Sequence, residues 1–136
     1  MQVLVDTSVW SLVLRRRSGP TQPNQLAAMS RLKDLIADGR TLIIGPVRQE
    51  LLSGIKDRKQ FEKLRAALDG FPDTPVSQSD YERAAEYFNL CRTKGLQGSN
   101  TDFLICAVAA GRNLPIFSLD GDFALFQRAL PITLLT

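Results

Sequence analysis

Four acidic residues fall where carboxylates could act together. They are Asp6, Glu50, Asp102 and Asp120. Asp6 and Asp120 each follow a short apolar run, whereas Glu50 and Asp102 lie early in segments with helical spacing. Carboxylates are hard oxygen ligands of the kind that Mg²⁺ and Mn²⁺ prefer. A cation so held can activate water and neutralise charge on a phosphate, so the chemistry these residues suggest is hydrolysis of a phosphodiester.

Each acid also has a purely local explanation. Asp6 can cap the helix that follows it, and Glu50 lies about one turn into a helix, where a negative charge suits the helix dipole. Asp102 is the fourth residue of Ser99-Asn-Thr-Asp, the pattern of a capping box. Asp120 belongs to Leu-Asp-Gly-Asp, which is ordinary turn chemistry. Taken singly, a cap or a turn suffices for every one of them.

The elements around the acids favour a shared site. Apolar runs predict strands at 2–6, 41–44, 115–119 and 132–135, with a brief strand at 74–76; helical spacing predicts helices at 8–16, 24–38, 45–55, 57–68, 79–94, 99–112 and 122–128. Strands separated by helices indicate an α/β fold: one domain over residues 1–136, with a mainly parallel central sheet and helices on both faces. All four acids would then lie at the carboxyl edge of the sheet, where ligands gather. There they would repel one another unless a cation sat among them.

Composition removes most other hydrolytic chemistry. The chain has 136 residues, 44% of them hydrophobic and 23% charged, as in globular proteins. It contains no histidine, which excludes Ser-His-Asp and Cys-His catalysis and most zinc enzymes. The two cysteines, Cys91 and Cys106, lie in apolar helical patterns and are expected to be buried free thiols. No secretory signal and no membrane-spanning run are visible, so the cytoplasm is the expected compartment.

The net charge of +3 is compatible with a polyanionic partner without requiring one. The run Arg15-Arg16-Arg17 could contact RNA phosphates or be a solvated loop entrance, and the sequence favours neither. Further basic residues are spread around the predicted helix at 57–68, which is more typical of a solvated surface than of an RNA-binding stripe.

Four short motifs in order resemble a known family. They are Val5-Asp-Thr-Ser-Val-Trp10, Val47-Arg-Gln-Glu-Leu-Leu-Ser-Gly54, Asp102-Phe-Leu-Ile-Cys-Ala107 and Ser118-Leu-Asp-Gly-Asp-Phe123. Their order is characteristic of PIN domains and is most similar to VapC-type toxins of type II toxin–antitoxin pairs. The motifs run from residue 5 to residue 123, which is nearly the whole chain.

The resemblance implies a Mg²⁺- or Mn²⁺-dependent endoribonuclease with Asp6, Glu50, Asp102 and Asp120 as its catalytic acids. Asp6 and Asp102 would be the principal metal ligands, with Glu50, Asp120 and Asp122 as further candidates. Asp122 could share or replace the role of Asp120. Thr7 matches a hydroxyl that commonly follows the first aspartate, and Ser8 could assist it.

The resemblance also implies partners. Besides an RNA substrate, these are a second copy of the chain in a homodimer and a cognate antitoxin whose tail occupies the active-site groove; no membrane is involved.

Three alternatives use similar residues. A receiver-like signalling domain needs paired acids after its first strand and a phosphoacceptor aspartate ending a central one, but Asp6 is single and no aspartate closes 41–44. A haloacid-dehalogenase-like phosphatase needs Asp-x-Asp, and position 8 is serine. The third is a catalytically silent PIN fold that is retained for binding. The presence of all four acids argues against it.

Overall fold

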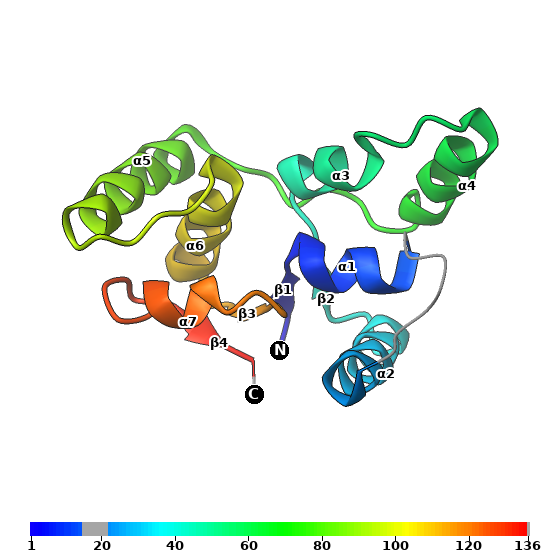
Figure 1. The fold of residues 1–136 in the computed structure, drawn as a ribbon, viewed down its shortest axis with the longest axis horizontal. Helices are drawn as coiled ribbons and strands as arrows, with labels where there is room; N and C mark the ends of the chain where they lie inside the picture. The colour runs from blue at the N-terminus through cyan, green and yellow to red at the C-terminus, as the bar shows by residue number, and fades with distance from the viewer. Residues whose placement is uncertain (15–21, 136) are drawn as a thin grey trace.

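The centre of the molecule is a parallel sheet of four short strands. The computed structural model describes residues 1–14 and 22–135. The strands are β1 (Val3–Val5), β2 (Thr41–Leu42), β3 (Pro115–Phe117) and β4 (Thr133–Leu134), in the order β2-β1-β3-β4 (Figure 1). Every pairing is parallel. The chain leaves β1 to one side for β2 and returns to the other side for β3, so the strand order reverses at β1 and opens a crevice there.

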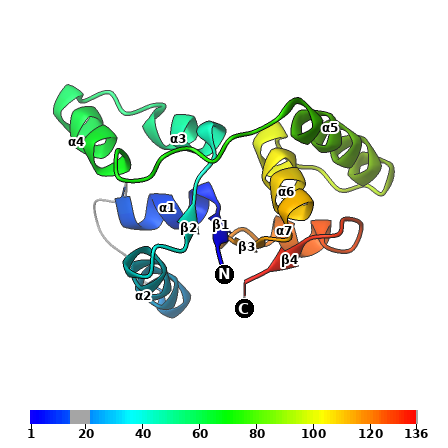
Figure 2. The same ribbon diagram turned by 180° about the vertical axis from the view of Figure 1, so that it is seen from behind.

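Seven helices in the described residues surround the sheet. They are α1 (Thr7–Leu14), α2 (Pro23–Ala37), α3 (Gly45–Leu52), α4 (Arg58–Leu68), α5 (Gln78–Thr93), α6 (Asn100–Arg112) and α7 (Asp122–Phe126). Figures 1 and 2 show α1 to α4 gathered on the β2 side and α5 to α7 on the β3 and β4 side. The predicted α/β class, with a parallel sheet between helices, is confirmed.

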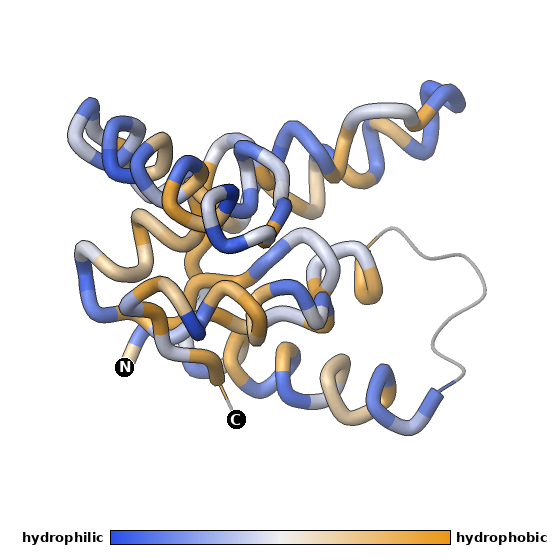
Figure 3. The backbone as a smooth tube through the Cα atoms, turned by 60° about the vertical axis from the view of Figure 1, so that its left-hand side comes forward, coloured by the Kyte–Doolittle hydropathy of each residue, from blue (hydrophilic) through white to orange (hydrophobic). Residues whose placement is uncertain are grey.

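The core joins the strands to α6. Every residue of β1 and β3 is buried, as is the continuous run Phe103–Ala109 of α6, so this helix is as central as its apolar sequence predicted. Trp10 is also fully buried and packs edge-on against Phe71, with ring centroids 4.9 Å apart. In Figure 3 orange and blue alternate along the helices, the pattern of amphipathic segments with one buried face.

Several further expectations can be compared with the structure. Cys91 and Cys106 are buried free thiols, as predicted. Within the described part of the chain, every helix is too short or too polar to cross a lipid bilayer.

The predictions of a strand at 74–76 and of a helix extending to residue 55 were wrong. Residues 74–76 form no strand: the contact with the sheet is an isolated bridge between Ile43 and Asp73, with one hydrogen bond from the Thr74 amide to the Ile43 carbonyl (2.7 Å). Pro75 has no amide proton, so a ladder cannot continue through it. Helix α3 ends at Leu52 and not at residue 55, because Gly54 adopts a left-handed backbone with φ +85°.

Two arginines attach the segment between α4 and α5 to the helices beside it. Arg48 of α3 forms an ion pair with Asp73 (2.8 Å) and donates to the carbonyls of Leu68 and Phe71. Arg112 of α6 donates to the carbonyl of Pro75 (2.7 Å). These bonds hold a segment without regular structure across the molecule, where its polar backbone groups would otherwise lack partners.

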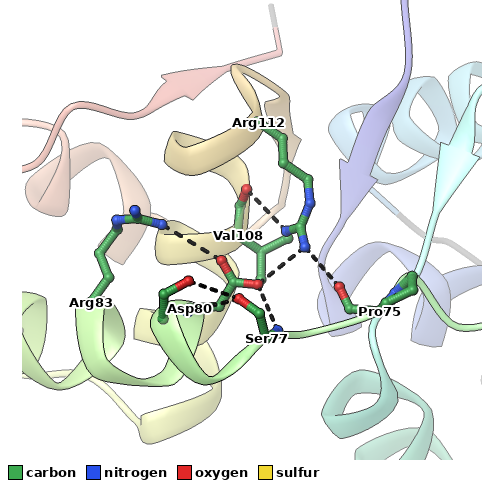
Figure 4. Close-up of polar contacts among 7 residues, drawn as sticks. Pro75, Ser77, Asp80, Arg83, Val108 and Arg112 are labelled. Carbon is green, nitrogen blue, oxygen red and sulfur yellow. Dashed lines mark hydrogen bonds and ion pairs between the residues drawn. The ribbon is translucent and has the colours of Figure 1, made fainter.

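Arg112 also belongs to a charged cluster around Asp80 (Figure 4). Asp80 is only 5% exposed. Its Oδ2 accepts from the Ser77 amide (2.9 Å) and from Arg112 (3.0 Å), while Oδ1 pairs with Arg83 (3.5 Å). Burial alone would raise the pKa of Asp80, but the hydrogen bonds from Ser77 and the charge of Arg112 outweigh it and hold the pKa below its usual value.

We expect Asp80→Asn to lower the free energy of unfolding at neutral pH by about 2 kcal/mol, because it removes charge-assisted hydrogen bonds and leaves Arg112 without a carboxylate partner. Because the folded pKa is depressed, this stabilisation is complete above the unfolded value of 3.8 and is lost as pH falls through the folded pKa. Urea titrations of both proteins from neutral to acid pH should therefore show a difference that shrinks with acidification. Asp69→Asn, an exposed control, should change stability by less than about 0.5 kcal/mol. Equal losses in the two variants would contradict the role assigned to the cluster.

Candidate active site

Asp6 lies at the point where the strand order reverses. It is the first residue after β1, it is 5% exposed, and its amide donates to the carbonyl of Phe117, which extends the β1–β3 ladder by one rung (2.9 Å). Its carboxylate Oδ2 accepts from the hydroxyls of Ser8 and Ser118, each at 2.8 Å, and more weakly from the Ser8 amide at 3.4 Å. Asp6 therefore caps α1 and also faces the crevice. A capping role and a place in a shared acidic site are thus compatible for this residue.

Glu50 reaches the same place from α3. The hydroxyl of Thr7, next to Asp6, donates to Glu50 Oε1 at 2.8 Å. This bond joins the first turn of α1 to α3 across 43 residues of sequence. The structure thus brings Thr7 and Glu50 together beside Asp6.

Asp102 combines a capping role with an unfavourable electrostatic position. It is the N3 residue of the capping box of α6: its Oδ2 accepts from the Ser99 amide (3.0 Å), and its own amide donates to the Ser99 hydroxyl (3.1 Å). Burial raises the pKa of Asp102; the hydrogen bonds from Ser99 offset part of the rise, and the charges of Asp6 and Asp120 add to it. Asp6 and Asp120 are therefore close enough for their charges to act on Asp102.

Asp120 and Asp122 lie in the turn between β3 and α7. The amide of Asp120 donates to the Ser118 hydroxyl, and Asp120 Oδ1 accepts from the Asp122 amide, both at 2.9 Å. The turn chemistry predicted for this motif is thus present. Asp120, and not Asp122, is among the charges that raise the pKa of Asp102.

The donors at this edge fit a hard divalent cation. All are oxygens, and like-charge repulsion at Asp102 is what a cation would relieve. In the described residues, no hydrogen bond reaches Oδ1 of Asp6, which leaves that oxygen for a ligand. Across the same residues, no three acidic or cysteine side chains converge tightly enough to form a ready cation-binding cluster. The fold gathers the carboxylates at one edge without closing them into a cage.

The basic residues considered from sequence divide into two groups. Arg15, Arg16 and Arg17 lie outside the described residues. On α4, Arg58 and Arg65 both pair with Glu62, at 2.9 and 2.6 Å, and are well exposed, which agrees with a solvated surface.

Two residues that arrange this site, Ser118 and Gly98, are not among the site residues predicted from the sequence. Ser118 follows β3 as Asp6 follows β1, and the register pairs Val5 with Phe117, so the two polar residues occupy the next rung. That shared position is the signal in the sequence. A Cβ atom at Gly98 would lie 2.6 Å from the Phe126 ring and 3.3 Å from Asp102 Oδ2, so this approach needs glycine; only the packing reveals it.

Fold and site together define an α/β protein with an acidic, histidine-free site at the switch point of a parallel sheet. The PIN domain family model matches residues 3–129, and the chain belongs to the PIN domain family. It is 28% identical over 130 residues to the VapC ribonuclease Mb1587 of Mycobacterium bovis, which covers 93% of this chain and 92% of that protein. The predicted resemblance to VapC-type toxins is confirmed.

Solved structures agree with the fold. FitAcB from Neisseria gonorrhoeae superposes with a TM-score of 0.75 at 19% identity, covering 99% of this chain and 97% of that one. VapBC2 from Rickettsia felis, bound to a DNA fragment from its promoter, gives 0.73 at 20% identity, covering 99% and 98%.

The raised pKa of Asp102 predicts that its charge opposes folding when no cation is present. An acid with a raised folded pKa stabilises the fold at low pH, and that contribution is lost as pH rises through the folded pKa. In EDTA at neutral pH, we expect Asp102→Asn to raise the melting temperature, since asparagine keeps the carbonyl that accepts from Ser99. Asp34→Asn, an exposed change on α2, should leave it unaltered. A lower melting temperature for Asp102→Asn would show that the carboxylate is not under repulsion.

Proposed function

We propose that the chain is a Mg²⁺- or Mn²⁺-dependent endoribonuclease that hydrolyses RNA phosphodiester bonds. The observation that carries the proposal is the convergence of acids at the switch point of the sheet: Thr7, beside Asp6, bonds to Glu50, and the Ser118 hydroxyl links Asp6 to the amide of Asp120. Membership of the PIN domain family and similarity to a protein named as a VapC ribonuclease support it. RNA is thus the proposed substrate, and the proposed compartment is the cytoplasm.

Each residue of the site has a proposed part. Asp6 and Asp102 would hold the cation, which, when bound, supplies an activated water and neutralises charge on the scissile phosphate. Glu50, oriented by the Thr7 hydroxyl, is exposed and suited to accept a proton from water. Asp120 is favoured over Asp122 as the fourth acid, because its charge acts on Asp102.

Contact between RNA and Arg15, Arg16 and Arg17 stays a proposal from sequence alone, and a solvated loop is its alternative. These arginines follow the helix that begins beside Asp6, so they lie close to the site along the chain. Arginine is well suited to phosphate recognition because its planar guanidinium donates in a fixed fork.

The direct test is RNA cleavage by the purified chain. We expect Mg²⁺ or Mn²⁺ to support cleavage and EDTA to abolish it. Asp6→Asn should reduce the cleavage rate by more than about 100-fold, because mutating even a residue that only hydrogen-bonds to a metal ligand lowers metal affinity or activity by about 10- to 100-fold. The control is again Asp34→Asn, which should cut at the wild-type rate. Cleavage that persists in EDTA and in Asp6→Asn would exclude the metal mechanism. A folded chain that binds Mn²⁺ yet cuts no RNA would favour the silent PIN fold, since the family match already sets the receiver-like alternative aside.

We further propose that the chain is the toxin of a toxin–antitoxin pair and forms a homodimer. Solved structures of similar fold include VapBC2 and others described as toxin–antitoxin complexes. A groove of about 860 Å³ lies between the end of α1 and α4. Its lining includes the apolar Leu14 and Leu64 and the charged Lys56, Asp57 and Lys63, of which two are basic and one is acidic. This surface suits an amphipathic, acidic segment of an antitoxin.

The homodimer has support in a second hollow, which borders the first turn of α6. Tyr81 of α5 is 54% exposed beside a hollow of about 380 Å³ formed with Pro46 of α3 and Leu104 of α6. An exposed aromatic residue next to an apolar hollow is typical of an interface.

The biological test is expression in cells. We expect the chain to arrest growth, Asp102→Asn to abolish the arrest, and co-expression of the antitoxin encoded beside it to restore growth. The stability expected for Asp102→Asn separates lost activity from lost folding. Light scattering of the purified protein should give a mass of two 15.1 kDa chains. Growth arrest by the Asp102→Asn variant would show that toxicity does not depend on the acidic site. A monomeric mass in light scattering would contradict the proposed homodimer.

A further inference from the structure

Two hydroxyl groups bridge the first acid to the loop that carries the fourth. Ser118 Oγ donates to Asp6 Oδ2 (2.8 Å) and accepts from the Asp120 amide (2.9 Å). Ser8 Oγ donates to the same Oδ2 (2.8 Å) and accepts from the Leu119 amide (2.9 Å). Each serine therefore connects the Asp6 carboxylate to a backbone amide of the turn after β3.

The direction of these bonds follows from the number of protons available. A hydroxyl has one proton, which both serines give to the carboxylate, and its lone pairs remain for the amides. The 3.3 Å contact between the two hydroxyls is then secondary. Bonds from a hydroxyl to an ionised carboxylate are among the stronger hydrogen bonds in proteins.

The bridges constrain both acids. With Oδ2 occupied by two hydroxyl donors, rotation of the Asp6 carboxylate about its last side-chain bond would break both bonds, so Oδ1 keeps one orientation. The same hydroxyls hold the amides of Leu119 and Asp120, which fixes the start of the turn that carries the Asp120 carboxylate. The β1–β3 register brings Ser118 to this place, while helix α1 brings Ser8.

We propose that Ser118, acting with Ser8, is a positioning residue: it fixes Asp6 and Asp120 relative to one another and thereby sets the affinity of the acidic edge for its divalent cation. The inference rests on the proposed function and deepens it. Ser118 itself does not touch the reacting atoms. Its effect is to arrange the carboxylates before the cation binds. Without the hydroxyl, the cation would have to order each acid on binding, and the free energy this costs would lower the affinity for the cation.

The test compares Ser118→Thr with Ser118→Val, which have the same shape and differ in the hydroxyl alone. Mn²⁺ is the probe, and its dissociation constant is measured by calorimetry, apart from any cleavage. We expect Ser118→Val to weaken Mn²⁺ binding by about 10- to 100-fold and Ser118→Thr to stay near wild type. In cleavage assays, Ser118→Val should need more Mn²⁺ for half-maximal rate and recover much of its rate at saturating Mn²⁺. Ser30→Ala, on the exposed surface of α2, should change neither value.

The outcomes separate this inference from the proposed function. A wild-type chain that neither binds Mn²⁺ nor cuts RNA would overturn the proposed function. A wild-type chain that does both, with equal Mn²⁺ affinity in the Thr and Val variants, would overturn the positioning role alone. Circular dichroism and melting temperatures show whether each variant folds. If Ser118→Val does not fold, Ser118→Ala and Ser8→Ala replace it, and unchanged Mn²⁺ affinity in both would be equally decisive.

Discussion

The placement of several carboxylates at one edge of a small parallel sheet is the constraint around which this structure is arranged. Asp6, Asp102 and Asp120 are close enough that two of them raise the pKa of the third. The burial of Asp102 and the charges beside it cost folding free energy at neutral pH, and hydrogen bonds within the protein offset part of that cost. The fold tolerates it by giving each carboxylate local hydrogen bonds: serine hydroxyls at Asp6, the Ser99 amide at Asp102 and the Asp122 amide at Asp120.

These local bonds explain why caps and a site coincide. A helix that follows a parallel strand starts at the carboxyl edge, so its capping residues lie where ligands bind. Asp6, next to α1, therefore serves the helix and faces the crevice with the same side chain. Helix α6 precedes β3 and joins it through a short connection, so α6 ends at the amino edge and its first turn, with Asp102, lies at the carboxyl edge. Their positions are fixed by backbone geometry, which is more rigid than a surface loop and better suited to hold a reacting group.

Holding that edge together depends on contacts remote from it. Helix α6 is buried along Phe103–Ala109, and its far end is fixed by Arg112, which joins Asp80 and the segment before α5. Arg48 does the same for α3, the helix that carries Glu50. The two ion-pair clusters thus stabilise the helices that bring Glu50 and Asp102 to Asp6, although neither cluster touches the site.

The sequence by itself determined the parts governed by short-range rules. Apolar periodicity located the strands and helices, the capping box at Ser99 located the start of α6, and the lack of histidine left carboxylates as the chemistry. Pro75, which prevents a strand at 74–76, and Gly54, which ends α3 early, were also visible in the sequence but were outweighed by neighbouring apolar residues. Only the tertiary structure decided how the acids meet. The bond from Ser118 to Asp6 spans 112 residues and that from Thr7 to Glu50 spans 43, and such contacts depend on strand order and register, which no local pattern specifies.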